Sequence, residues 1–207
     1  MSDALHRHPG INLGPAHAEA DVQAEEMVFG FWVFLMSDAI IFGVLFATYA
    51  SMRMATAGGP GPHELFDIRS AFGESFALLS SSFTFGMASV SLKHDQRRGP
   101  LLMWLGITLF LAAGFLALEV HDFLSMFAKG GGPTRSGFLS SFFALVPLHG
   151  LHVTTACVWM LALIAQMMRF GLDSEVKLGL LRLGLFWHFL DIVWIAIFSI
   201  VYLGGLA

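Results

Sequence analysis

Three pairs of ionisable side chains, each with its members three residues apart, interrupt long apolar stretches of the sequence. The pairs are Glu119 and Asp122, His149 and His152, and His188 and Asp191. Side chains at this spacing project from one face of a helix. Asp38 and Glu74 are further carboxylates in apolar surroundings. Ionisable groups within a membrane span are costly, so they usually face protein or water and mark either proton and ion pathways or buried helix contacts.

The histidines are the first side chains to consider for a redox cofactor, because imidazole is a common axial ligand of haem. His149 and His152 share one helix and cannot ligate opposite faces of one haem. A carboxylate di-metal site needs Glu-x-x-His motifs on facing helices, and the sequence contains none. We therefore expect no catalytic, cofactor-binding or metal-ligating residue in this chain. The paired groups are expected to serve either proton movement or helix packing.

The composition is that of an integral membrane protein. Hydrophobic residues make up 56% of the 207 residues and charged residues 13%, against about 25% charged residues in a soluble domain. The formal net charge of -4 argues against nucleic acid as a partner. The single cysteine, Cys157, excludes a disulfide within the chain.

Five apolar stretches are long enough to cross a bilayer core of about 30 Å. The predicted fold is therefore an all-α integral membrane protein with five transmembrane helices in a bundle, within a domain covering 27–207. The predicted spans are residues 28–52, 70–92, 100–124, 138–168 and 182–204. Residues 1–26 are polar and are expected to form a mobile cytoplasmic tail. Asp173-Ser174 resembles a helix start signal, and glycine and proline predict turns in two connections, 57–62 and 129–133.

Lysine and arginine positions predict the orientation. Seven lie on the side of the N-terminus and four on the other side, which predicts a cytoplasmic N-terminus and a periplasmic C-terminus. Four basic residues on the cytoplasmic side are candidate contacts for lipid headgroups: Lys93, Arg97, Arg98 and Arg182.

This orientation also predicts depths within the membrane. Asp38, His188 and Asp191 enter from the cytoplasmic side and are expected to meet in the inner half of the membrane, at about 8 to 15 Å from the start of their spans. Carboxylates from the second and third spans are expected near the outer face. Small residues at every fourth position of the first span predict close helix packing there: Ala39, Gly43, Ala47 and Ser51. Trp187 is a candidate interface anchor.

Two stretches, FFALVPLHGLHV at 142–153 and FWHFLDIVW at 186–194, resemble the signature segments of subunit III of haem-copper oxidases. The segment 31–49, centred on Asp38, resembles that family's helix with an intramembrane carboxylate, where many members have Glu. Leu118-Glu119 resembles a further family carboxylate. Features similar to the cytochrome bo-type ubiquinol oxidase branch are GGP at 58–60, RSGFL at 135–139 and five spans rather than seven.

The resemblance implies an accessory, cofactor-free subunit of a proton-pumping terminal respiratory oxidase that transfers electrons from ubiquinol to O2. It implies packing against subunit I, which would hold the haem and copper, within a complex that also has subunits II and IV. Bound phospholipid and a bacterial inner-membrane location are further implications. The subunit would support stability, proton uptake and sustained turnover. Subunit III of a cytochrome c oxidase is the alternative, and a stand-alone membrane proton or ion transporter is a more remote one.

Overall fold

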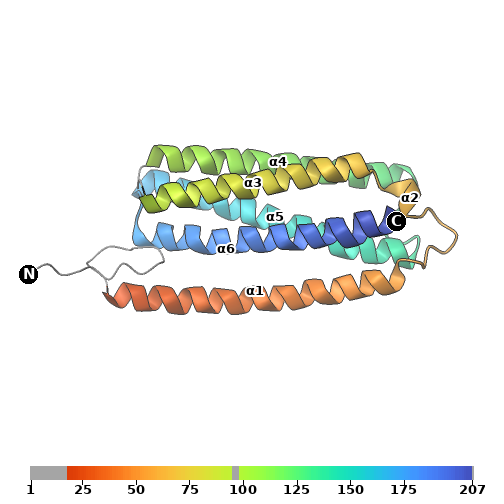
Figure 1. The fold of residues 1–207 in the computed structure, drawn as a ribbon, viewed down its shortest axis with the longest axis horizontal. Coiled ribbons are helices and arrows are strands. Elements are labelled where there is room, and N and C mark those ends of the chain that lie inside the picture. The colour runs from red at the N-terminus through yellow and green to blue at the C-terminus, as the bar shows by residue number, and fades with distance from the viewer. Residues whose placement is uncertain (1–17, 95–97, 207) are drawn as a thin grey trace, which may run out of the picture.

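The computed structural model describes residues 18–94 and 98–206. Within these residues the chain is a bundle of long helices whose successive members run antiparallel (Figure 1). The long helices are α1 (Ala18–Met52), α3 (Ile68–His94), α4 (Arg98–Ala128), α5 (Gly137–Phe170) and α6 (Ser174–Ile197). Shorter elements are α2 (Pro62–Leu65), the π-helical segment η1 (Phe198–Leu203) and α7 (Gly204–Leu206).

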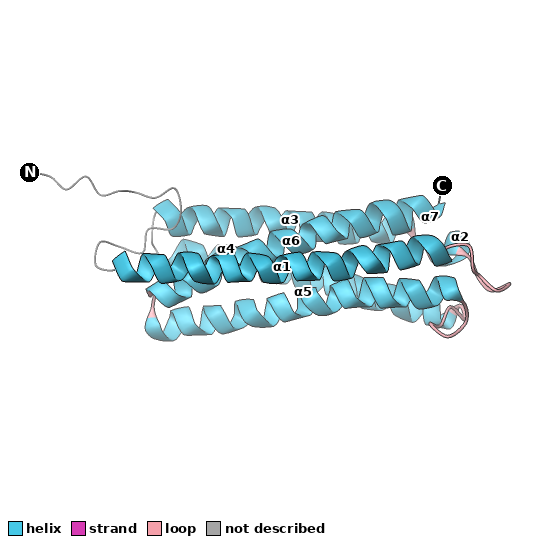
Figure 2. Ribbon diagram, turned by 90° about the horizontal axis from the view of Figure 1, so that it is seen from below, coloured by secondary structure: helices cyan, strands magenta, loops and turns pink. Residues whose placement is uncertain are grey.

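Five segments are long and apolar enough to cross a membrane, as predicted. They are Glu26–Met52, Ile68–Leu92, Arg98–Ala128, Gly137–Phe170 and Glu175–Leu206. The two ends of the described chain lie at opposite ends of the bundle (Figure 2), which an odd number of crossings requires.

Two predicted boundaries need correction. Helix α1 begins at Ala18, so residues 18–26, assigned to the polar tail, are its first turns; residues 1–17 lie outside the described residues. The fifth long helix begins at Ser174 rather than at 182. The Asp173-Ser174 signal marked this start correctly, and the Lys177 N–H donates to the Asp173 carbonyl at 3.0 Å. The first turns of α6 contain the polar residues Glu175 and Lys177, so hydropathy alone does not include them in the span.

Local sequence fixes where the helices begin and end. Ser136 caps α5, because its side-chain oxygen accepts a hydrogen bond from the Leu139 N–H at 3.2 Å. Helix α4 ends in a Schellman motif. Gly130 has φ 75°, a conformation that glycine adopts without penalty. Its N–H donates to the Phe127 carbonyl, and the Gly131 N–H donates to the Met126 carbonyl.

The buried stripe of α4 shows how the bundle core is organised. Its buried residues alternate four and three apart, which is the heptad spacing of a helix packed along its length. They are Leu101, Leu105, Thr108, Ala112, Phe115, Glu119, Asp122 and Met126. Two carboxylates therefore occupy positions of the stripe that otherwise hold apolar core residues or threonine.

Helix α1 lies on the side of the bundle away from α3 and α4, against α5 and α6 (Figure 1). Its inward positions Leu35, Asp38, Phe42 and Tyr49 are buried. The predicted small-residue packing surface does not face another helix of this chain. Gly43 is exposed, and a Cβ atom built on it meets no atom within 4 Å.

Candidate functional site

Three carboxylates from two helices gather in the half of the bundle nearest α2. Glu74 comes from α3, and Glu119 and Asp122 come from α4. They are 0%, 2% and 8% exposed respectively, and Glu74 is close enough to the other two for their charges to interact. The three carboxylates thus lie in one region of the bundle, and the expectation that this region is near the outer face of the membrane stays a prediction.

The Glu119 carboxyl occupies a notch that a glycine leaves open on α5. A Cβ atom at Gly150 would overlap Oε2 of Glu119 and lie 2.8 Å from its Oε1. This close approach seats Glu119 against the backbone of α5 beside His149. Glycine at 150 is therefore explained by space rather than by backbone conformation.

Asp122 connects the carboxylates to the end of the bundle. Ser70, in the first turn of α3, donates to its Oδ1 at 2.8 Å. His121 is next to it in sequence, with Nδ1 3.5 Å from the same oxygen and a side chain that is 78% exposed. Asp122 thus has one polar partner at the buried side and one at the exposed side.

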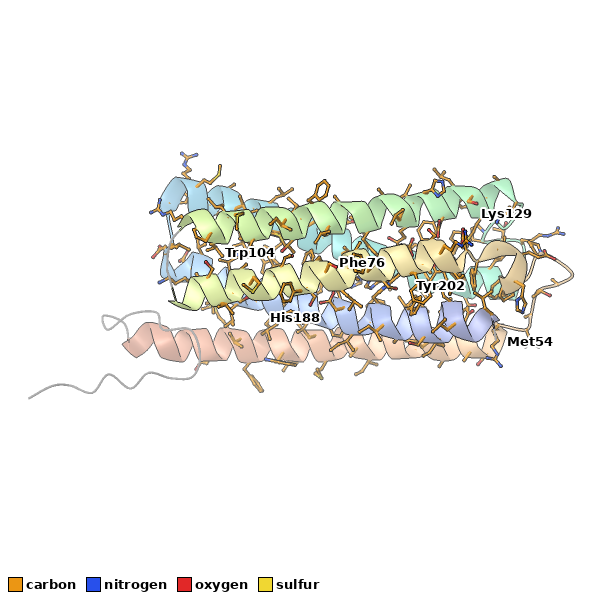
Figure 3. All side chains as sticks on the ribbon, turned by 45° about the horizontal axis from the view of Figure 1, so that its top comes forward. Met54, Phe76, Trp104, Lys129, His188 and Tyr202 are labelled. Carbon is orange, nitrogen blue, oxygen red and sulfur yellow. The ribbon has the colours of Figure 1, made fainter. Side chains whose placement is uncertain are left out.

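The π-helical segment places Tyr202 beside the same carboxylates. Tyr202 is 1% exposed and lies within electrostatic range of Glu74, Glu119 and Asp122. Figure 3 shows it in the half of the bundle that also contains Lys129 and Met54. The sequence reading missed this tyrosine, because a pure α-helical periodicity does not anticipate the change of phase that a π segment introduces.

His149 lies deeper, among aromatic rings from three helices. Its ring centroid is 6.4 Å from Phe42 of α1, 6.0 Å from Phe115 of α4 and 5.4 Å from Trp194 of α6. It is fully buried, and neither ring nitrogen has a hydrogen-bonding partner among the described residues. Trp194 connects His149 to α3, because the indole N–H of Trp194 donates to Ser75, which is adjacent to Glu74.

Asp38 pairs with the other histidine of α5. Its Oδ2 lies 3.7 Å from Nε2 of His152. The opposite ring nitrogen, Nδ1, lies 2.7 Å from the Leu148 carbonyl one turn back. This corrects the expectation that Asp38 would meet His188 and Asp191.

His188 faces α3 instead. Its Nδ1 lies 2.9 Å from Oγ of Ser82 and 3.5 Å from Oδ2 of Asp191. Its side chain is 51% exposed, whereas that of Asp191 is 8% exposed. Because α6 begins earlier than predicted, His188 lies near the middle of the span Glu175–Leu206, consistent with its place in Figure 3.

Hydroxyl groups of α3 join it to its two neighbours, α4 and α6. Thr84 lies 2.8 Å from Thr108 of α4, oxygen to oxygen. Trp187 of α6 donates to Ser81 at 3.2 Å. Trp187 is 2% exposed, so its proposed role as an interface anchor is wrong and it is a core residue.

The candidate lipid contacts lie at the other end of the bundle. The Arg98 guanidinium lies against the backbone of Gly171. Arg182 is half-buried, and its Nε has no hydrogen-bonding partner among the described residues. Lys93 belongs to the last turn of α3, and Arg97 falls outside the described residues.

These groups suit proton binding and helix contact better than metal or haem ligation. Among the described residues no group of three or more His, Cys, Asp or Glu side chains is arranged to hold a metal ion. His149 and His152 both approach Phe42 from the same helix. Proton movement and helix packing stay the predicted roles of these groups.

The known proteins that this chain resembles include third subunits of terminal oxidases. The family model of cytochrome c oxidase subunit III matches residues 12–206. The chain is 45% identical over 208 residues to the cytochrome bo(3) ubiquinol oxidase subunit 3 of Pseudomonas aeruginosa, covering 99% of both chains. It is 39% identical to the quinol oxidase subunit 3 of Bacillus subtilis, covering 93% of this chain and 96% of that one. It is 37% identical to a cytochrome c oxidase subunit 3 of Bacillus sp. strain PS3, covering 90% of each.

Proposed function

The chain belongs to the cytochrome c oxidase subunit III family, and we propose from this membership that it serves a proton-pumping terminal oxidase whose electron donor is ubiquinol. The observation that carries the choice of donor is the near full-length match to a ubiquinol oxidase subunit 3 at 45% identity. The match to a cytochrome c oxidase subunit 3 reaches 37% over 90% of the chain. The subunit itself is accessory.

The outer surface of the bundle supports docking on another subunit. His188 is half-exposed near the middle of its span, with Ser82 beside it. Lipid offers no hydrogen bonds, so a polar group at this depth normally faces protein or water. A second subunit with a hydrogen-bonding side chain would satisfy it. We propose subunit I, which would hold the haem and copper, as the main contact, within a complex that includes subunits II and IV.

The free face of α1 is a second surface suited to protein or lipid. It carries only large apolar side chains and small residues around Gly43. The exposed large residues are Phe29, Trp32, Val33, Phe34, Met36, Ile40, Ile41 and Val44. Phospholipid can lie between such a face and a partner, and Arg98 of α4 and Arg182 of α6 are separate candidate contacts for lipid headgroups at one end of the bundle. In the orientation predicted from the lysines and arginines, these residues lie on the cytoplasmic side of a bacterial inner membrane.

Purification of the oxidase complex tests the proposal. The complex should show haem absorption and oxidise ubiquinol, and the subunit dissociated from it should show none of that absorption. The complex without the subunit should start at a comparable rate but lose activity over repeated turnovers. Haem in the separated subunit would contradict the accessory role. Oxidation of reduced cytochrome c but not of ubiquinol would contradict the proposed donor.

A stand-alone transporter makes a different prediction. The isolated subunit, reconstituted into liposomes that contain a pH-sensitive dye, would then dissipate an imposed pH gradient. We expect a leak equal to that of liposomes without protein, since the polar groups of the described residues occupy separate clusters rather than one continuous chain of contacts across the bundle. A faster leak that the Asp38→Asn variant abolishes would favour the transporter.

A further inference from the structure

We propose that Glu74 and Glu119 form a buried carboxyl pair that binds a proton, and that this proton exchanges with the aqueous phase at the His121 end of the bundle through Asp122. The site is distinct from the Asp38–His152 pair. It is a binding site for protons and water within the bundle, and it goes beyond the proposed role in an oxidase.

Burial and proximity limit the charge that the pair can hold. Glu74 is 0% exposed and Glu119 is 2% exposed, and the two are close enough to interact electrostatically. Two carboxylates that share a buried site cannot both ionise without a large penalty. Among the described residues, Glu74 interacts electrostatically with Glu119 and Asp122, and Tyr202 interacts with these three carboxyls and with Tyr49. None of these interacting groups is a lysine or an arginine. At least one of the two carboxyls therefore carries a proton.

The unpartnered atoms show that the pair needs a further ligand. Both oxygens of Glu74 and Oε1 of Glu119 have no hydrogen-bonding partner among the described residues. A protonated carboxyl requires an acceptor and its partner requires a donor. Water supplies both, and a buried water typically makes about three hydrogen bonds to such groups. The chemistry of the site thus favours water shared between the two carboxyls.

Two features of the helices shape this site. Gly150 leaves the space in which the Glu119 carboxyl sits, because any side chain there would overlap it. The π segment Phe198–Leu203 brings the hydroxyl-bearing Tyr202 to the carboxylates. Single π turns within α-helices occur frequently at functional sites. Neither feature is needed by a core that is held together by apolar packing alone.

Asp122 provides the connection to solvent. It is 8% exposed, accepts a hydrogen bond from Ser70, and has the exposed His121 3.5 Å away. Asp122 also interacts electrostatically with Glu74. The titratable groups that face the pair are Asp122 from α4 and Tyr202 from η1, with His149 of α5 next to Gly150 in sequence. Asp122 adjoins the exposed imidazole of His121, so the exchange path runs toward that end.

Infrared spectroscopy of the purified complex tests proton binding. A protonated carboxyl has a C=O band distinct from that of a carboxylate, and this band shifts to lower frequency in D2O. We expect Glu74→Gln and Glu119→Gln each to remove a shifting band that the parent shows. Glu175→Gln, which alters an exposed carboxylate at the other end of the bundle, should leave the band unchanged. A parent spectrum without such a band, or a band that survives both pair variants, would overturn the proposal.

The time course of the D2O shift tests the path. Asp122→Asn keeps an acceptor for Ser70 but cannot ionise, and it should slow the exchange of the band by roughly tenfold or more, equivalent to at least about 1.4 kcal/mol in barrier height. His121→Gln should slow it less. Exchange at the parental rate in Asp122→Asn would show that protons reach the pair by another path. Because these readouts are spectra of the subunit's own carboxyls, they hold whichever electron donor the complex uses.

Discussion

Asp38 of α1 and His152 of α5 lie next to each other across the contact between the two helices, with Oδ2 of the aspartate 3.7 Å from Nε2 of the histidine. Nδ1 of His152 lies 2.7 Å from the Leu148 carbonyl. A carbonyl only accepts, so Nδ1 carries a hydrogen. At 3.7 Å the two groups approach each other without a direct hydrogen bond, and Oδ2 of Asp38 has no hydrogen-bonding partner among the described residues.

Replacement of Asp38 separates ionisation from packing. Asp38→Asn keeps the size and polarity of the side chain beside Nε2 of His152, so the stability of the complex in detergent should stay close to the parent. Asp38→Leu removes the polar group beside Nε2 and should cost on the order of 1 kcal/mol in unfolding free energy. Thermal unfolding of both variants measures the difference. Equal stability would mean that this pair does not hold α1 in place.

The same Asp38→Asn variant tests whether the carboxyl has a protonic role. Oxidase rate, proton pumping and activity loss over many turnovers should be measured against the parent. Parental values for all three would assign Asp38 to helix packing alone. A faster loss of activity with unchanged thermal stability would assign it a role that needs ionisation.

Gly150→Ala should displace the Glu119 carboxyl. Its Cβ would overlap Oε2 of Glu119, and overpacking of this kind typically costs about 1–3 kcal/mol. Gly114→Ala in α4 is the matched control, because a Cβ there meets nothing within 4 Å. Thermal unfolding should show a loss for the first variant and none for the second. Recovery of stability in Gly150→Ala combined with Glu119→Ala would identify the clash as the cause.

Gly43→Leu tests what covers the free face of α1. A Cβ at Gly43 meets no atom of this chain within 4 Å, so the isolated subunit should unfold at the parental temperature. If a partner helix packs there closely, the leucine will prevent its approach and less subunit will co-purify with the complex. Normal assembly with normal stability would instead indicate a lipid-facing surface.

The sequence predicts the spans well because their signal is physically strong. A run of apolar residues long enough for a bilayer leaves little choice of structure. The errors are at the ends: Ala18 and Ser174 begin helices within polar segments, where hydropathy carries no signal. The Asp173-Ser174 signal predicts the start of α6 correctly. It does not by itself say how far His188 lies from the end of the span.

The candidate site was less readable. Spacing identified which face each ionisable group shares, and the grouping of Glu74, Glu119 and Asp122 followed from orientation and depth. The partners across helices depend on how the helices rotate and tilt. This is why depth alone groups Asp38 with His188 and Asp191, whereas the structure places it beside His152. The position of Tyr202 cannot be predicted without the π segment that carries it. The small residues around Gly43 predict a close helix contact, but periodicity does not say whether that contact lies within this chain.

Two tryptophans of α6 clamp that helix to α3 through serine hydroxyls. Trp187 donates to Ser81 and Trp194 donates to Ser75, at 3.2 and 3.0 Å. Each serine in turn donates to a carbonyl of its own helix, at 2.6 Å for Ser81 and 2.8 Å for Ser75. Each hydroxyl thereby uses its only hydrogen and one of its two lone pairs, so each tryptophan completes a relay between antiparallel helices.

A double-mutant cycle on Trp187 and Ser81 measures this clamp. Ser81→Ala leaves the buried indole N–H without a partner, and Trp187→Phe removes the donor while keeping an aromatic ring. Both single variants should lower the unfolding free energy of the subunit in detergent, and the pair should be less destabilised than their sum by about 0.6 kcal/mol, at most about 1.7 kcal/mol. Ser80→Ala, for which the described residues show no hydrogen bond, is the control and should be close to neutral. Additive losses from Ser81→Ala and Trp187→Phe would show that aromatic packing alone, such as the stacking of Trp187 on Phe85, joins the two helices.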